Sequence, residues 1–205
     1  MIKKRIGVFE TNSSSMHSLV IKKSGHKQSL SDALGGKYSL IKGNKLKINE
    51  DDLYFDREPF KIITSAIDKF FYLIADISNN DGYMYDDVLF HKLTKSLKTA
   101  YPEIEEIVFP IIIDDELPFL YKTNFYGFVD HQSKGMITNY LKDNNIDPVD
   151  FIQNTKYIII IDGDEYCIWD NFKDENLINI DEIETEINPF SKVAKPYEKE
   201  LPYED

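Results

Sequence analysis

The run Ile158–Ile161 constrains the fold of this chain more than any other feature. Lys156 and Tyr157 precede the run, and Asp162-Gly-Asp-Glu165 follows it. β-Branched residues favour strands, and a strand that is apolar on both faces has to be covered on both sides by other elements. The Asp-Gly-Asp sequence and the following Tyr166–Asp170 segment predict a hairpin. We therefore expect residues 156–161 to form a buried strand of a sheet.

A second segment, Phe60–Ile77, predicts the helix that covers this sheet. Pro59 suits the start of a helix, and Asn79-Asn-Asp-Gly82 is expected to end it. Its apolar residues recur at spacings of three and four: Ile63, Ala66, Ile67, Phe70, Phe71 and Ile74. We expect an α+β fold, with a mixed, mainly antiparallel sheet and this amphipathic helix (about residues 60–77) packed on one face.

The same patterns predict the other elements. Strands are expected at residues 4–10, 18–23, 104–113 and 125–129, and a hairpin from 38–41 to 45–48 across Lys42-Gly-Asn44. Helices are expected at 30–34, 85–99 and 136–142, with a further short helix capped by Asp147 and begun by Pro148. We expect one domain over residues 1–183, followed by a tail (184–205) that wraps the surface or is flexible.

Composition excludes several classes of protein. Hydrophobic residues make up 42% of the chain, which is enough for a core and argues against global disorder. No apolar run approaches the length of a membrane span, and no secretion signal opens the chain, so we expect a bacterial cytoplasmic location without a membrane partner. One cysteine, Cys167, excludes a disulfide framework and a cysteine-rich zinc site.

Charge is distributed unevenly along the chain. Residues 1–49 hold ten Lys and Arg and two acids, a net of +8; the remaining 14 Lys and Arg and 34 Asp and Glu give residues 50–205 a net of −20. Such asymmetry is typical of a segment that faces a polyanion. The simpler expectation is that the basic segment lies against the acidic body of the same domain.

The strongest candidate site is the segment Thr11-Asn-Ser-Ser-Ser-Met-His17 between two apolar runs. Asn12 and the three serines Ser13, Ser14 and Ser15 can offer side-chain oxygens and backbone N–H groups to an anion, with Arg5 offsetting its charge. His17 is a candidate acid or base. The alternative is a polar loop whose side chains satisfy their own backbone.

A second candidate segment is Asp130-His-Gln-Ser-Lys134, which follows a predicted strand. Asp130 and His131 are candidates for acid–base work, and Ser133 and Lys134 for contacts to a phosphate. The alternative is again a polar loop. No metal site is predicted, because the Asp162-Gly-Asp-Glu165 acids are what a tight hairpin requires. No cofactor-binding motif is present, so any cofactor stays unknown.

Two segments resemble a family of uncharacterised proteins of bacteriophages and low-GC bacteria. Phe9-Glu-Thr-Asn-Ser-Ser-Ser-Met-His-Ser18 is similar to the F-E-T-N-S-S-S-T-H-S opening of that family, with Met16 in place of threonine. Tyr126-Gly-Phe-Val-Asp-His-Gln-Ser133 is similar to a Y-G-Y-I-D-H-x-S segment of the same group. The resemblance implies a phage or mobile-element setting and no mechanism.

Two functions from different classes are therefore expected. In the first, the segments bearing His17 and His131 meet in one pocket of an enzyme that processes a phosphate-containing ligand, a nucleotide or a nucleic acid. In the second, the acidic surface binds a host protein as an anti-defence inhibitor, for example by mimicking nucleic acid. A structural phage protein without a small ligand is a third possibility.

Overall fold

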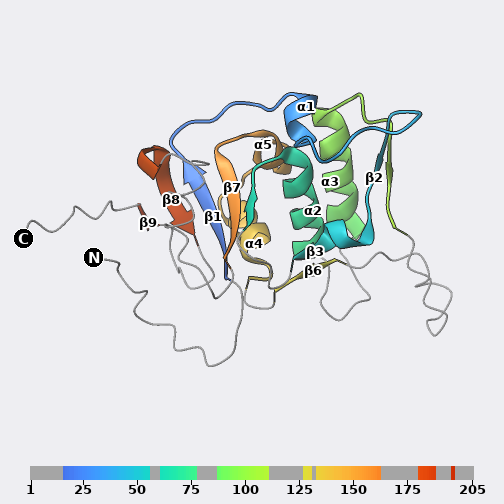
Figure 1. The fold of residues 1–205 in the computed structure, drawn as a ribbon. Coiled ribbons are helices and arrows are strands. Elements are labelled where there is room, and N and C mark those ends of the chain that lie inside the picture. The colour runs from blue at the N-terminus through green and yellow to red at the C-terminus, as the bar shows by residue number, and fades with distance from the viewer. Residues whose placement is uncertain are drawn as a thin grey trace, which may run out of the picture.

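The computed structural model describes residues 16–55, 61–77, 87–110, 127–130, 133–162, 180–187 and 195–196. The strand expected at residues 4–10 and the second hairpin strand expected at 166–170 lie outside these ranges. Within them, the chain forms an α+β fold with a sheet at one side and helices packed against it (Figure 1). This fold class was predicted from the sequence.

The main sheet is antiparallel throughout, in the order β4-β7-β1-β8-β9. Its strands are β1 (Met16–Lys22), β4 (Lys61–Ile63), β7 (Tyr157–Asp162), β8 (Ile183–Ile187) and β9 (Lys195–Pro196). Strand β7 lies between β1 and β4, and its four isoleucines are at most 3% exposed. The prediction of a strand buried on both faces is confirmed.

Two short parallel pairs complete the described strands. They join β2 (Lys45–Lys47) to β5 (Glu106–Val108) and β3 (Tyr54–Phe55) to β6 (Phe128–Val129). The hairpin expected from 38–41 to 45–48 forms only at its turn, where a single antiparallel bridge joins Ile41 to Lys45. Pairing with β5 instead sets Leu46 opposite Ile107, and Leu46 becomes completely buried.

Within the described ranges, five α-helices pack around the core. They are α1 (Leu30–Ala33), α2 (Ala66–Ile77), α3 (Asp87–Ala100), α4 (Met136–Asp143) and α5 (Pro148–Gln153), with 3-10 turns at Glu50–Leu53 and Ile180–Glu182. Helix α2 lies between the sheet and α3 (Figure 1). Ten of its twelve residues are buried. The predicted cap of α5 is confirmed, since the Asp147 side chain accepts the Val149 N–H with Pro148 at the first helical position.

The first part of the predicted 60–77 helix is a strand. Lys61–Ile63 is β4, whose Ile62 lies opposite Ile160 of β7. The helix begins only after Ser65, whose Oγ accepts the Asp68 N–H (3.1 Å) and donates to the Asp68 carboxylate (2.6 Å). This reciprocal cap supplies the start that Pro59 was expected to provide, and the β-branched Ile-Ile-Thr run before it favours a strand.

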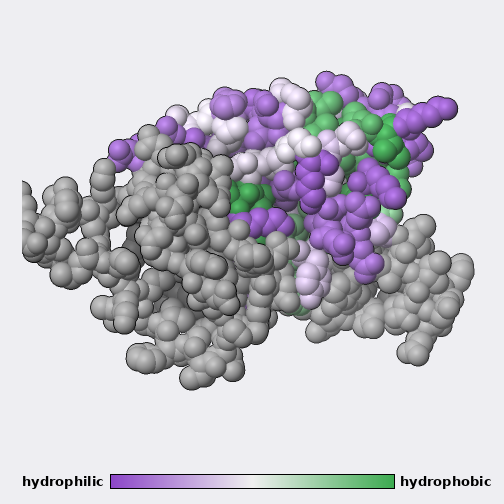
Figure 2. All heavy atoms as spheres, in the orientation of Figure 1, coloured by the Kyte–Doolittle hydropathy of each residue, from purple (hydrophilic) through white to green (hydrophobic). Residues whose placement is uncertain are grey.

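The expected boundary at residue 183 coincides with the first residue of β8. Residues 184–187 belong to that strand and pair with β1. Hydrophilic residues cover most of the described surface in Figure 2, with hydrophobic residues gathered mainly near its upper right. Among the described helices, none has the length and apolar character needed to cross a membrane.

Candidate functional site

His17 lies near the start of β1 and is completely buried. Side chains alternate along a strand, so His17 shares a face with Leu19, which belongs to the core packed around α2. Its Nδ1 lies 2.8 Å from the hydroxyl of Tyr72 on α2, and the two rings meet edge to face. Burial, with a smaller contribution from Lys61, lowers the pKa of His17 to about 3. The imidazole is therefore neutral at physiological pH.

The backbone of His17 joins the two segments that the sequence singled out. Its N–H donates to Ser133 Oγ at 3.0 Å, across 116 positions of the chain. Ser133 is completely buried, and its own N–H donates to the carbonyl of Asp130 (2.9 Å). Asp130 is 2% exposed and follows β6, with its N–H bonded to Phe55 of β3. The strand end and the Asp130–Lys134 segment are thus held together by direct contact.

Tyr72 is the aromatic centre of this region. It is fully buried, and its ring packs against that of Phe55 at a centroid distance of 5.0 Å. Burial raises the pKa of Tyr72 well above its ordinary value, with smaller contributions from the carboxylates of Asp76 and Asp130. The phenol therefore stays protonated, and either partner of the Tyr72–His17 bond can be its donor, depending on the histidine tautomer.

Asp76, one turn further along α2, anchors the start of α4. Its carboxylate accepts the N–H of Gly135, the N–H of Thr138 (2.9 Å) and the Thr138 hydroxyl (2.7 Å). Gly135 has a positive φ of 74° and no side chain with which to cap the helix, so α2 supplies the cap that α4 lacks. Burial raises the pKa of Asp76, against the lowering effect of these hydrogen bonds.

Two lysines bring positive charge to the region. Lys61 of β4 lies 5.3 Å from the centre of the Phe55 ring and disfavours protonation of His17. Lys134 is exposed and lowers the pKa of Asp76 as a minor contributor. The region therefore combines two buried carboxylates, those of Asp76 and Asp130, with cations at its margin that offset part of their charge.

The structure describes four of the predicted site residues: His17, Asp130, Ser133 and Lys134. It brings His17 and Ser133 into contact and places Asp130 and Lys134 on the same short segment. The others lie outside the described residues: Arg5, Asn12, Ser13, Ser14, Ser15 and His131. The expected meeting of the two histidines is therefore a prediction that the described residues leave open.

Two side chains of the region, Tyr72 and Asp76, escape the sequence patterns used above. Both lie on α2, where the helical spacing accounts only for the apolar residues around them. The sequence does contain one signal for them, because this helix is apolar around most of its circumference. A helix of that kind is buried on all sides, so its few polar side chains have to find buried partners.

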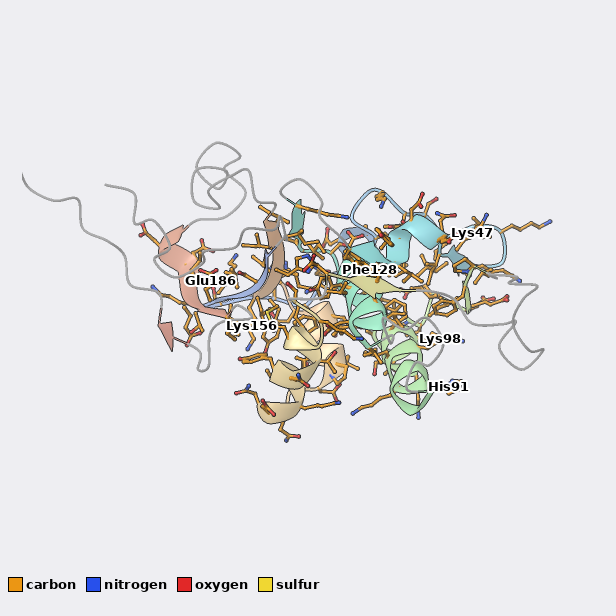
Figure 3. The ribbon with its side chains drawn as sticks, turned by 90° about the horizontal axis from the view of Figure 1, so that it is seen from below. Lys47, His91, Lys98, Phe128, Lys156 and Glu186 are labelled. Atoms are coloured by element: carbon orange, nitrogen blue, oxygen red, sulfur yellow. The ribbon has the colours of Figure 1, made fainter. Side chains whose placement is uncertain are left out.

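No group of three His, Cys, Asp or Glu side chains suited to a metal ion occurs among the described residues. The described part of the site lies beside β6, whose Phe128 is labelled in Figure 3, and is formed by α2, the start of β1 and residues 130 and 133–135. Comparisons of the chain with known protein families, curated proteins and solved structures gave no match. Function therefore has to be argued from the site itself.

Proposed function

We propose that this protein binds and processes a phosphate-containing ligand, a nucleotide or the end of a nucleic acid, where the Thr11–His17 and Asp130–Lys134 segments meet. The observation that supports this most is the hydrogen bond from the His17 N–H to Ser133 Oγ. It joins the only two segments whose composition suggests a site. From the sequence resemblance, we place this activity in a phage or mobile element acting in the cytoplasm of a bacterial host.

The charges favour an anion as the ligand. Lys61 and Lys134 lie at the margin of the site, and Arg5 and the serines of residues 13–15 precede His17 in the chain. At the start of α4, the N–H groups of Gly135 and Thr138 are already taken by Asp76, so these two are not available to a ligand. Phosphate would therefore depend on Lys134 and on the segment that leads into β1.

Burial changes the role we assign to His17. A base whose pKa is about 3 removes a proton poorly at neutral pH, and the ring is completely enclosed. We propose that His17 is a positioning residue, which holds Tyr72 and fixes the start of β1 against Ser133. In this proposal His131 acts as the acid or base, with Asp130 as its neighbouring carboxylate.

A thermal-shift screen tests this function. Nucleotides, inorganic phosphate and short oligonucleotides would be added to the wild type and to His131→Ala, Lys134→Gln and, as a matched control, the exposed His26→Ala. We expect one ligand class to raise the Tm of the wild type and of His26→Ala but of neither site variant, because a ligand stabilises a protein according to its affinity for the native state. Equal shifts in all four proteins, or none, would contradict the proposal.

One observation favours the inhibitor as a second candidate. Asp181, Glu182, Glu184 and Glu186 fall within the short turn and strand at residues 180–187. However, the described acids are interspersed with lysines, as in the Lys22–Glu182 ion pair (2.9 Å), so this part of the surface is not uniformly acidic. A salt-sensitive complex with one host protein, with no Tm response to any phosphate compound, would favour this candidate over the enzyme.

A further inference from the structure

A separate groove opens between α2, α3, α4 and the turn that leads into α5. Its volume is about 290 Å³, close to the lower end of the usual range for small-molecule sites. Its apolar lining is aliphatic throughout: Leu73, Ile77, Leu93, Leu141, Ile146 and Pro148. Thr138 and Asn145 add polar atoms at its wall. It is built from other side chains than the His17–Ser133 contact and needs its own explanation.

Two lysines on different helices border the groove. Lys92 extends from α3 and Lys142 from the last turn of α4, and both are exposed. Within the described part of the chain, neither ammonium group has a hydrogen-bond or ion-pair partner. The described lining contains no acidic side chain, although the chain holds 36 Asp and Glu. Positive charge at the rim of an apolar groove is therefore left uncompensated by its own lining.

We propose that this groove binds a small amphipathic carboxylate with a flexible alkyl chain. The alkyl chain would lie along the leucines of α2, α3 and α4, where burial of apolar surface favours binding. The carboxylate would lie between Lys92 and Lys142, whose charges it complements. The inference is independent of the proposed phosphate site, because no residue of the Asp130–Lys134 segment lines the groove.

The lining also argues against a nucleotide in this groove. Nucleobases are commonly held by stacking on aromatic rings, and the described lining provides no aromatic ring. Aliphatic side chains suit a flexible alkyl chain, which can follow an irregular surface. The small volume further favours a short or medium-length chain over a phospholipid with two acyl chains.

Isothermal titration calorimetry of the full-length protein with decanoate tests the proposal. The variants are Lys92→Gln, Lys142→Gln and the double variant. Lys98→Gln is the matched control, because Lys98 is an exposed lysine of α3 outside this groove (Figure 3). We expect one decanoate to bind per chain, each groove variant to weaken binding about fivefold, and Lys98→Gln to leave it unchanged.

Decanol and decyltrimethylammonium separate the contribution of charge from that of the alkyl chain. We expect decanol to bind more weakly than decanoate and the cation to bind least, since the lysines repel it. The absence of decanoate binding to the wild type would overturn the proposal. So would equal affinities for the three probes, or equal affinities of the wild type and the double variant for decanoate. None of these results would affect the phosphate-site proposal, whose variants are different.

Discussion

Each half of α2 carries one buried ionisable side chain that caps the end of a neighbouring helix, and these two side chains have opposite charges. In the first half, Lys69 is completely buried and its Nζ donates to the carbonyls of Phe151 (3.1 Å), Asn154 (2.8 Å) and Tyr157 (3.4 Å). It thereby closes the C-terminal end of α5. In the second half, Asp76 accepts from the N–H groups at the start of α4. A cation at a helix C-terminus and an anion at a helix N-terminus both complement the helix dipole.

The two halves of α2 differ in the other groups that surround each buried ionisable side chain. Around Lys69 the partners are backbone carbonyls, and a cation with three carbonyl acceptors is accounted for by structure alone. Around Asp76 the helix also carries Tyr72, which holds His17, and the bonded segment includes Ser133. Buried ionisable groups are thus insufficient to mark a site. We propose a function only where such groups meet the segments around His17 and Ser133, which the sequence singles out independently.

The largest effect is expected from Asp76→Ala. The change leaves the partly buried Gly135 and Thr138 N–H groups and the Thr138 hydroxyl without their acceptor, and unfolding should become easier by about 3 kcal/mol. Urea denaturation measures this. The control is Asp143→Ala, an exposed acid of α4 that should change stability by less than about 0.5 kcal/mol. Similar values for both variants would show that α4 does not depend on its cap from α2.

A smaller loss, about 2 kcal/mol, is expected from Lys69→Met. Methionine keeps most of the apolar stem but removes a donor from three carbonyls, of which that of Asn154 keeps the Tyr157 N–H at 3.4 Å, while the cost of burying an ammonium disappears. Lys98→Met, on the exposed face of α3, is the control for urea denaturation. A variant as stable as the wild type would mean that the two halves of α2 are not equivalent in their capping.

The difference in stability between the wild type and Lys69→Met should also depend on pH. Burial lowers the pKa of Lys69 to about 7 from 10.5. Between these values the unfolded chain binds a proton that the folded chain lacks, so the free energy of unfolding rises with pH. Relative to Lys69→Met, the wild type should therefore gain stability from about pH 7 to 10. A constant difference would show that Lys69 keeps its proton when folded.

The sequence predicts those features of the fold that depend on neighbouring residues, and misses those that depend on contacts between distant segments. The isoleucine run and the Asp147-Pro148 cap are local signals, and both elements form as expected. Pairing of β2 with β5 and the bond between His17 and Ser133 are long-range contacts that no local period encodes. The sequence marked both partners of that bond as unusual, but only the fold shows that they touch. Tyr72 and Asp76 were hidden because helical spacing explained the residues around them.

A fourth prediction concerns the acid side of the pH range, where His17 titrates. Its pKa is lowered from 6.5 to about 3, so the unfolded chain takes up a proton there that the folded chain excludes. Stability from the neutral imidazole is complete above pH 6.5 and is lost as the pH falls towards 3. The wild type should lose about 1.4 kcal/mol per pH unit relative to His17→Gln between about pH 4 and 6. Parallel curves for the two proteins would show that His17 is accessible to protons and would restore its candidacy as a base.

The smallest effect is expected from Tyr72→Phe, which separates packing from hydrogen bonding. The phenyl ring keeps its contacts with Phe55 and loses only the bond to His17 Nδ1, so unfolding should become easier by about 1 kcal/mol. Tyr54→Phe, at a ring that is 46% exposed, is the control and should lie within about 0.5 kcal/mol of the wild type. If His17 is a positioning residue, Tyr72→Phe should also reduce the Tm gain from the phosphate ligand, because a freed ring no longer fixes the start of β1. A variant that loses stability but keeps the full ligand response would assign the His17–Tyr72 pair to the core alone.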